Sequence, residues 1–150
     1  MKSILPALLC LALSAPAALA AEPELMAALS VMGYGYKVQV LVNGADVGVE
    51  GGKSEGRRLF NKGHEMAAKA APAMRAKNFV LVPGANQVTI DYAKLDPKSN
   101  DALEVTFEAA GYPQPVLRFT NKGRPTGKVS FTVNVEAKPP ADFKPVVVSL

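Results

Sequence analysis

The segment VGVEGGKSEG, residues 47–56, contains residue types that bind phosphate. A P-loop has Gly, four further residues and then Gly-Lys-Ser or Gly-Lys-Thr, because its backbone N–H groups must wrap the phosphates. Counted back from Gly52-Lys53-Ser54, the first glycine belongs at position 47, where this chain has Val47. No helix start follows to present its N-terminus to a phosphate. The segment therefore predicts no nucleotide site, and no nucleotide is expected as a ligand.

The same segment matches the hydrolase pattern Gly-x-Ser-x-Gly around Ser54. That pattern works only as a strand-to-helix elbow, with an acid and then a histidine later in the chain. No helix is expected at Ser54, and the sole histidine, His64, follows ten residues later. The sole cysteine, Cys10, lies in a segment expected to be removed, which excludes a Cys-His nucleophile. We therefore expect a non-enzymatic protein, with a hydrolase as a minor alternative.

Metal ligands are scarce in this sequence. A zinc site needs more nitrogen or sulfur ligands than the chain provides. His64, Met66 and Met74 lie close in sequence, and imidazole with thioether ligands suits copper. Methionines on an alanine-rich segment are, however, more typical of packing. We therefore expect no cofactor, and these three residues are only weak candidates for a copper site.

Two groups of residues are candidates for binding. Lys53, Arg57 and Arg58 form a cationic trio beside a glycine-rich stretch, where we expect them to be solvated. Tyr34 and Tyr36, in the segment GYGY, are candidates for the exposed aromatic platform that sugar-binding modules offer. The preferred interpretation places Tyr36 in the core, because it begins an alternating strand pattern.

Residues 1–20 have the three parts of a secretory signal peptide: the cation Lys2, an apolar run over residues 4–13, and a small-x-small cleavage site at residues 18–20. The run is too short to cross a bilayer, which takes about 20 residues. No later stretch of that length lacks charge, so we expect no transmembrane segment. The mature chain is expected in the periplasm or outside the cell, and a lipid anchor on Cys10 is the weaker alternative.

Cleavage leaves 130 of the 150 residues and removes the only cysteine, so no disulfide holds the mature chain. Roughly two-thirds of the unfolded surface is buried in a domain of that size, which is enough for a core. The net charge of +4 falls to +3 without Lys2 and is scattered along the chain. An envelope protein or a surface polymer is the expected partner. Nucleic acid is not an expected partner, because the protein is expected to be exported and no basic stripe is interleaved with aromatic residues.

Most of the mature chain alternates apolar and polar residues with period two, which predicts half-buried strands. The clearest examples are YKVQVLV, NQVTIDY, ALEVTFEA and KVSFTVNVE, and Asn-Gly and Pro-Gly turn pairs separate such segments. Seven or eight strands without alternating helices predict an all-β fold, an antiparallel immunoglobulin-like β-sandwich over residues 36–150. Residues 21–35 are expected to be a lead-in, and the final segment PVVVSL is expected to pair within its own sheet.

Residues 51–78 interrupt the strand pattern. Their second part, from 63 to 78, is rich in Ala, Lys and Met, which favours a helix. Pro72 disfavours a helical Ala71, so one short helix is expected near residues 64–71. The whole of 51–78 is therefore predicted to be a helical or loop insertion in the sandwich. Long insertions on a rigid sheet often carry function.

Two segments, VLVNGADVG and FVLVPGANQVTIDY, combine strands with an Asn-Gly turn and the sequence Pro-Gly-x-Asn-x-hydrophobic. They resemble exported sandwich modules, namely galactose-binding-like jelly rolls and small PEGA-type surface domains. The resemblance covers a minor part of the chain and rests on turn residues. It therefore implies a fold and not a ligand.

Together these features predict an exported binding or accessory module that holds its partner through loops or an exposed strand edge. The alternative is a carbohydrate- or small-ligand-binding module that uses the 51–78 insertion and the GYGY segment. The chain has no tryptophan, which makes this alternative the weaker one, because sugar sites commonly stack a sugar on an aromatic ring.

Overall fold

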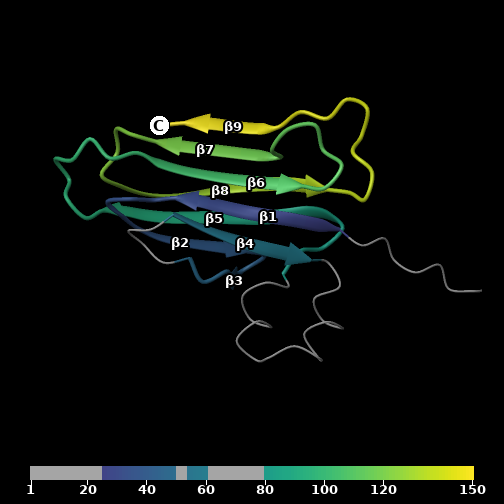
Figure 1. Ribbon diagram of the computed structural model, residues 1–150, viewed down its shortest axis with the longest axis horizontal. Helices are drawn as coiled ribbons and strands as arrows, with labels where there is room; N and C mark the ends of the chain where they lie inside the picture. Colours follow the sequence, from purple (N-terminus) through teal and green to yellow (C-terminus); the bar gives the residue numbers. More distant parts are fainter. Residues whose placement is uncertain (1–24, 50–53, 61–79) are drawn as a thin grey trace, which may run out of the picture.

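The computed structural model describes residues 25–49, 54–60 and 80–150. These residues form nine strands, and no helix lies among them. The strands are β1 (Met26–Met32), β2 (Tyr36–Val42), β3 (Ala45–Asp46), β4 (Ser54–Phe60), β5 (Gly84–Lys94), β6 (Leu103–Ala109), β7 (Leu117–Asn121), β8 (Thr126–Val135) and β9 (Val146–Ser149). Figure 1 shows most of them running along the long axis of the molecule. The short helix predicted near residues 64–71 lies outside the described residues.

The strands form two sheets. One sheet has five strands in the order β4-β1-β6-β7-β9, and the other has four strands in the order β3-β2-β5-β8. Neighbouring strands are antiparallel, except that β7 and β9 are parallel. The apolar residues of both sheets form one core between them, as in a β-sandwich. The predicted all-β fold is confirmed, with one parallel pair where only antiparallel pairs were expected.

The strands follow the alternation that the sequence predicted. In β2, Val38, Val40 and Val42 are buried, whereas Lys37 and Gln39 between them are exposed. The eleven residues of β5 alternate in the same way over most of their length. The predicted pairing of the final segment within its own sheet is also confirmed, because β9 pairs with β7.

Two strands occur where the sequence predicted none. β1 lies in the expected lead-in 21–35, yet it pairs with both β4 and β6. Its sequence MAALSVM does alternate, but alanine and methionine favour helices and hide the strand signal. β4 lies in the expected 51–78 insertion. Its inward positions Glu55 and Arg57 are charged, so they interrupt the apolar alternation that marks a strand.

Aromatic rings join the two sheets across the core. The ring centroids of Tyr92 in β5 and Phe119 in β7 are 5.7 Å apart, and Phe119 lies 5.9 Å from Phe131 in β8. Tyr36 meets Tyr92 edge to face at 6.2 Å. Because Phe119 contacts rings from both β5 and β8, β7 packs over this part of the four-stranded sheet.

The hydroxyl groups of the two core tyrosines have different surroundings. Oη of Tyr36 donates to the carbonyl of Asp101 at 3.1 Å and accepts from Nδ2 of Asn121 at 3.0 Å. Oη of Tyr92 is buried and has no hydrogen-bond partner in the described part of the chain. Burial is the main cause that raises the pKa of both phenols above 10.0, so both are neutral at pH 7.

The two segments that resemble exported sandwich modules meet in one turn network. Asn43 begins the Asn-Gly turn in the left-handed conformation, with φ of 51°. Its Nδ2 donates to Oδ1 of Asn86 at 2.9 Å, and its Oδ1 accepts the N–H of Gln87 at 2.9 Å. Asn86 is fully buried and bonds the N–H and the carbonyl of Val82 at 3.0 and 2.9 Å. The Pro-Gly-x-Asn pattern therefore ties the β2–β3 turn to the start of β5.

The two tyrosines provide a matched test of the core. We expect Tyr36→Phe to lower the free energy of unfolding by about 1–3 kcal/mol, because it leaves the buried Nδ2 of Asn121 with one partner fewer. We expect Tyr92→Phe to be neutral or stabilising, because it removes a buried hydroxyl that has no partner among the described residues. Urea denaturation of both variants measures the difference. An equal loss of unfolding free energy in both variants would contradict the different roles assigned to the two hydroxyl groups.

Candidate interaction surface

Two members of the predicted cationic trio lie on opposite faces of β4. Arg57 points inward, where its Nη2 lies 2.8 Å from the carbonyl oxygen of Gly48 and 2.9 Å from Oε2 of Glu55. The prediction that Arg57 is solvated was therefore wrong, because these two contacts hold it at the rim of the core. Arg58 is exposed on the outer face, as expected. Lys53 lies outside the described residues.

The two candidate tyrosines differ in exposure. Tyr34 lies in the turn between β1 and β2 and is 62% exposed, whereas Tyr36 at the start of β2 is 0% exposed. The preferred core position of Tyr36 is confirmed, so its ring is not offered to a ligand, and Tyr34 stays a candidate.

The weak copper candidates His64, Met66 and Met74 lie outside the residues that the structure describes. Within residues 25–49, 54–60 and 80–150, no group of three or more His, Cys, Asp or Glu side chains is placed to hold a metal ion.

The side of the sandwich formed by β3 and β4 is closed. The contact between Arg57 and Gly48, two residues beyond β3, joins the outermost strands of the two sheets. The ion pair of Arg57 with Glu55 places charges on the inner face of β4, and their side chains are only 26% and 12% exposed. Inward charges on an edge strand, together with a very short partner edge such as β3, discourage pairing with another chain.

The opposite side of the sandwich has a long edge strand, β8, which has no inward-facing charge. β8 has ten residues, and β5 is its only neighbour among the described strands. Its sequence TGKVSFTVNV contains no proline and one charge, Lys128, and valine, phenylalanine and threonine favour strands. An edge of this kind is a template for another strand.

The free backbone groups of β8 can be assigned. The N–H of Lys94 in β5 bonds the carbonyl of Pro125 at 2.7 Å, one position beyond the register pair Ala93–Thr126. Hydrogen-bonded pairs alternate along an antiparallel ladder, so the odd-numbered residues of β8 bond to β5. The even-numbered residues direct N–H and carbonyl groups away from β5, and they are Thr126, Lys128, Ser130, Thr132 and Asn134.

An apolar strip lies beside this edge, and we call it the open seam. It consists of the inward side chains Val129 and Phe131 of β8 and Val146, Val148 and Leu150 of β9 and its end, all of which are only partly buried. β9 is bonded to the far side of β7, beyond the position where Phe131 meets Phe119. Figure 1 shows β9 at the upper edge, beyond β8. Val133 of β8 and Val146 of β9 line one cavity at one end of this strip, and no described strand follows β8 in its sheet to cover the rest of β9.

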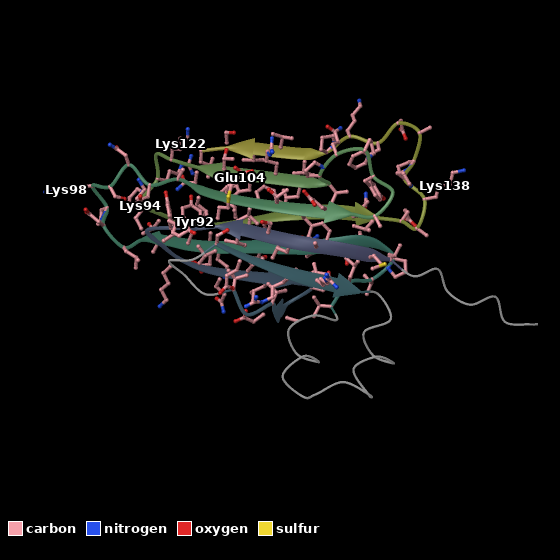
Figure 2. All side chains as sticks on the ribbon, in the orientation of Figure 1. Tyr92, Lys94, Lys98, Glu104, Lys122 and Lys138 are labelled. Carbon is pink, nitrogen blue, oxygen red and sulfur yellow. The ribbon has the colours of Figure 1, made fainter. Side chains whose placement is uncertain are left out.

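Each end of the open seam has its own chemistry. At the end of β8 that follows the β7–β8 turn, Lys122, Arg124 and Lys128 are exposed. Figure 2 shows Lys122 at this end, with Lys94 and Lys98, and Lys138 at the other end. The other end holds a cavity of about 180 Å³, whose lining includes Tyr112, Val133, Phe143 and Val146. The lining also includes the charged residues Glu136, Asp142 and Lys144. The open seam thus runs from a cationic end to a cavity with a mixed apolar and polar lining.

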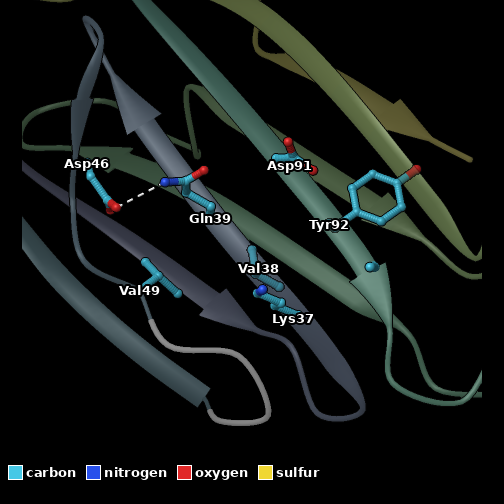
Figure 3. A pocket seen from close by; sticks show the side chains of 8 residues that line it. Lys37, Val38, Gln39, Asp46, Val49, Asp91 and Tyr92 are labelled. Atoms are coloured by element: carbon cyan, nitrogen blue, oxygen red, sulfur yellow. Dashed lines mark hydrogen bonds between the residues drawn. The ribbon is translucent and has the colours of Figure 1, made fainter.

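A second depression lies on the outer face of the four-stranded sheet. It has a volume of about 530 Å³, and its lining includes Lys37, Gln39, Asp46 and Asp91 (Figure 3). Nε2 of Gln39 donates to Oδ2 of Asp46 at 3.1 Å, and Oδ1 of Asp46 accepts the N–H of Gly48 at 2.7 Å. Both carboxylate oxygens of Asp46 therefore already accept a hydrogen bond from a neighbouring residue. The side chains named above make the surface of the depression polar.

The open seam was not predicted as a site from the sequence. Val129 and Phe131 alternate like the residues of any half-buried strand, and only the sheet order shows that β5 is the sole described strand bonded to β8. The run of three valines in VVVS does not indicate which of them face the core. Val146 and Val148 do, whereas Val147 faces outward and is 61% exposed.

No protein-family model, curated protein or solved structure matches the chain. Among the described residues there is no helix with the length and apolar character that a membrane span requires. Fold alone does not assign a function, so the surfaces of the molecule carry the functional argument.

The adjacent arginines of β4 test the closed side. We expect Arg57→Ala to lower the free energy of unfolding by about 1–2 kcal/mol, because it removes a partly buried ion pair and the bond to Gly48. We expect Arg58→Ala to change it by less than about 0.5 kcal/mol, because that side chain is solvated. Chemical denaturation provides both values, and a larger loss in Arg58→Ala would refute the assignment.

Proposed function

We propose that this protein is an exported, non-enzymatic β-sandwich of the immunoglobulin-like kind, which acts as a binding or accessory module of the cell envelope. In this proposal residues 1–20 are a cleaved signal peptide, and the mature protein works in the periplasm or outside the cell. Its partner is another envelope protein, held along the edge of β8. The observation that carries the proposal is the contrast between the closed β3–β4 side and the long β8 edge, beyond which no described strand lies.

The β8 edge has the properties that strand addition uses. An added strand gains main-chain hydrogen bonds, which give affinity, while alternate side chains give specificity. The even-numbered residues of β8 supply the free backbone groups, and the open seam supplies apolar surface beside them. Removing this apolar surface from water favours binding and offsets part of the entropic cost of association.

A carbohydrate- or small-ligand-binding module is the second candidate function. It is favoured by the polar depression around Gln39 and Asp91, which lies on a rigid sheet face. A glycan that raised the melting temperature of the wild type, but not of Asp91→Ala, would favour this function over the first. Among the described residues, Tyr34 has the exposed aromatic ring on which a sugar could stack.

Two substitutions at one residue test the proposed edge. Ser130→Pro removes a free backbone N–H and places a ring on the edge, whereas Ser130→Ala keeps the N–H. Both lose the hydroxyl contact with Oγ1 of Thr89, which is 2.8 Å long. In affinity capture from an envelope extract, we expect Ser130→Pro to recover the partner at least about tenfold less than the wild type, a loss of about 1.4 kcal/mol or more. We expect Ser130→Ala to recover it normally.

Thermal melts of the three proteins are the control for this experiment. Position 130 does not bond β5 through its backbone, so Ser130→Pro should fold and melt close to Ser130→Ala. Equal recovery of every captured protein by both variants would contradict the use of the β8 edge.

A further inference from the structure

We infer that the occupant of the β8 edge is a single extended segment of the partner protein, which becomes the fifth strand of the four-stranded sheet and covers β9. The segment alternates apolar and polar residues and carries an acidic residue at its carboxyl end. This inference rests on the proposed function, because it specifies what kind of partner the β8 edge accepts.

The unequal width of the two sheets indicates a missing strand. On the closed side, the outermost strands β4 and β3 are joined through Arg57 and Gly48. On the other side, Phe131 of β8 packs on Phe119 of β7, and β9 extends one strand further. A strand added to β8 would lie over β9 and cover the inward side chains Val148 and Leu150. It would give both sheets five strands.

The same overhang excludes the edge of another sandwich as the occupant. A second copy that paired its β8 with this β8 would bring its own β7 behind the added strand, because Phe131 packs on Phe119 in each copy. That position is already occupied by β9 of the first copy. In such a dimer, β7 of the second copy and β9 of the first copy would therefore occupy the same space. The occupant must arrive without a second layer behind it, as an extended terminus or loop does.

The accessible length of the edge sets the size of the segment. The first seven residues of β8, Thr126–Thr132, flank the partly buried side chains of the open seam. Beyond them Val133 and Val135 are already buried, at 2% and 1% exposure. A segment of about seven residues spans this part of β8 at roughly 3.4 Å per residue.

The alternation of the edge sets the side-chain pattern. Residues directly across an antiparallel pair share one face of the sheet. Apolar side chains of the segment must therefore lie opposite Val129 and Phe131, where they face the open seam. Polar side chains must lie opposite Lys128, Ser130 and Thr132, which face solvent. The cavity of about 180 Å³ beside Val133 and Val146 lies beyond the seven residues of the segment, so the segment does not fill it.

The charge of the edge sets the orientation. Lys128 is the only charge on β8, and Lys122 and Arg124 are exposed in the turn before it. An acidic residue of the segment is favoured at this end, because opposite charges across an interface fix register. Antiparallel pairing is slightly more stable than parallel pairing, so the acid lies at the carboxyl end of the segment.

A synthetic peptide tests this inference directly. The probe is fluorescein-labelled Thr-Val-Thr-Val-Thr-Val-Glu, titrated with the full mature protein and followed by fluorescence anisotropy. We expect saturable binding to the wild type and to Ser130→Ala, and at least about tenfold weaker binding to Ser130→Pro. A peptide with lysine in place of glutamate should bind more weakly, and the difference should shrink as salt is added.

A peptide of the same composition with its three valines in a row is the matched control, because it has no apolar face. Absence of binding by the alternating peptide, or equal binding of the control peptide, would overturn the single-segment inference. So would a dimer of the wild type in sedimentation that Ser130→Pro dissociates, because it would make a second copy the occupant. If the peptide fails while capture from envelope extract still depends on Ser130, the proposed function stands and the inference alone falls.

Discussion

The structure depends on one constraint: a five-stranded sheet must be covered by a four-stranded sheet, without a disulfide among the described residues. The aromatic contacts of Phe119 with Tyr92 and Phe131 set how the two sheets overlap. At the β3–β4 side the overlap is completed by Arg57, whose guanidinium reaches the backbone beyond β3. At the β8–β9 side nothing described completes it. The open seam is the direct consequence of this mismatch in width.

The fold was largely readable from the sequence because burial on one face imposes period two. The strands β2, β5, β6 and β8 were predicted from this alternation, and the Asn-Gly turn was placed correctly between β2 and β3. The Pro-Gly pair was expected to be a turn after a strand, whereas Gly84 is the first residue of β5 and residues 80–82 form no strand. β1 escaped prediction because its outward positions are Met26 and Met32, which expose apolar side chains to solvent. β4 was not predicted because its inward residues Glu55 and Arg57 are charged. They form an ion pair in the folded sandwich, and the local sequence does not indicate this pairing.

The candidate site was readable only in part. Arg57 and Arg58 look alike in the sequence, but strand pairing with β1 separates them to opposite faces. Tyr36 was placed in the core correctly from its position in an alternating strand. The open seam could not be derived, because it depends on the parallel pairing of β9 with β7 and on the absence of a described neighbour of β8. Both are properties of strand order, which local alternation does not encode.

Amide hydrogen exchange along β8 tests the central claim most directly. In the free protein, the amides of Lys128 and Ser130 should exchange fast, and those of Val129 and Phe131 slowly, because only the latter bond to β5. With the alternating peptide bound, the amides of Lys128 and Ser130 should become protected while Arg58 on β4 does not change. Slow exchange of the Lys128 and Ser130 amides in the free protein, or no gain of protection with the peptide, would contradict the account.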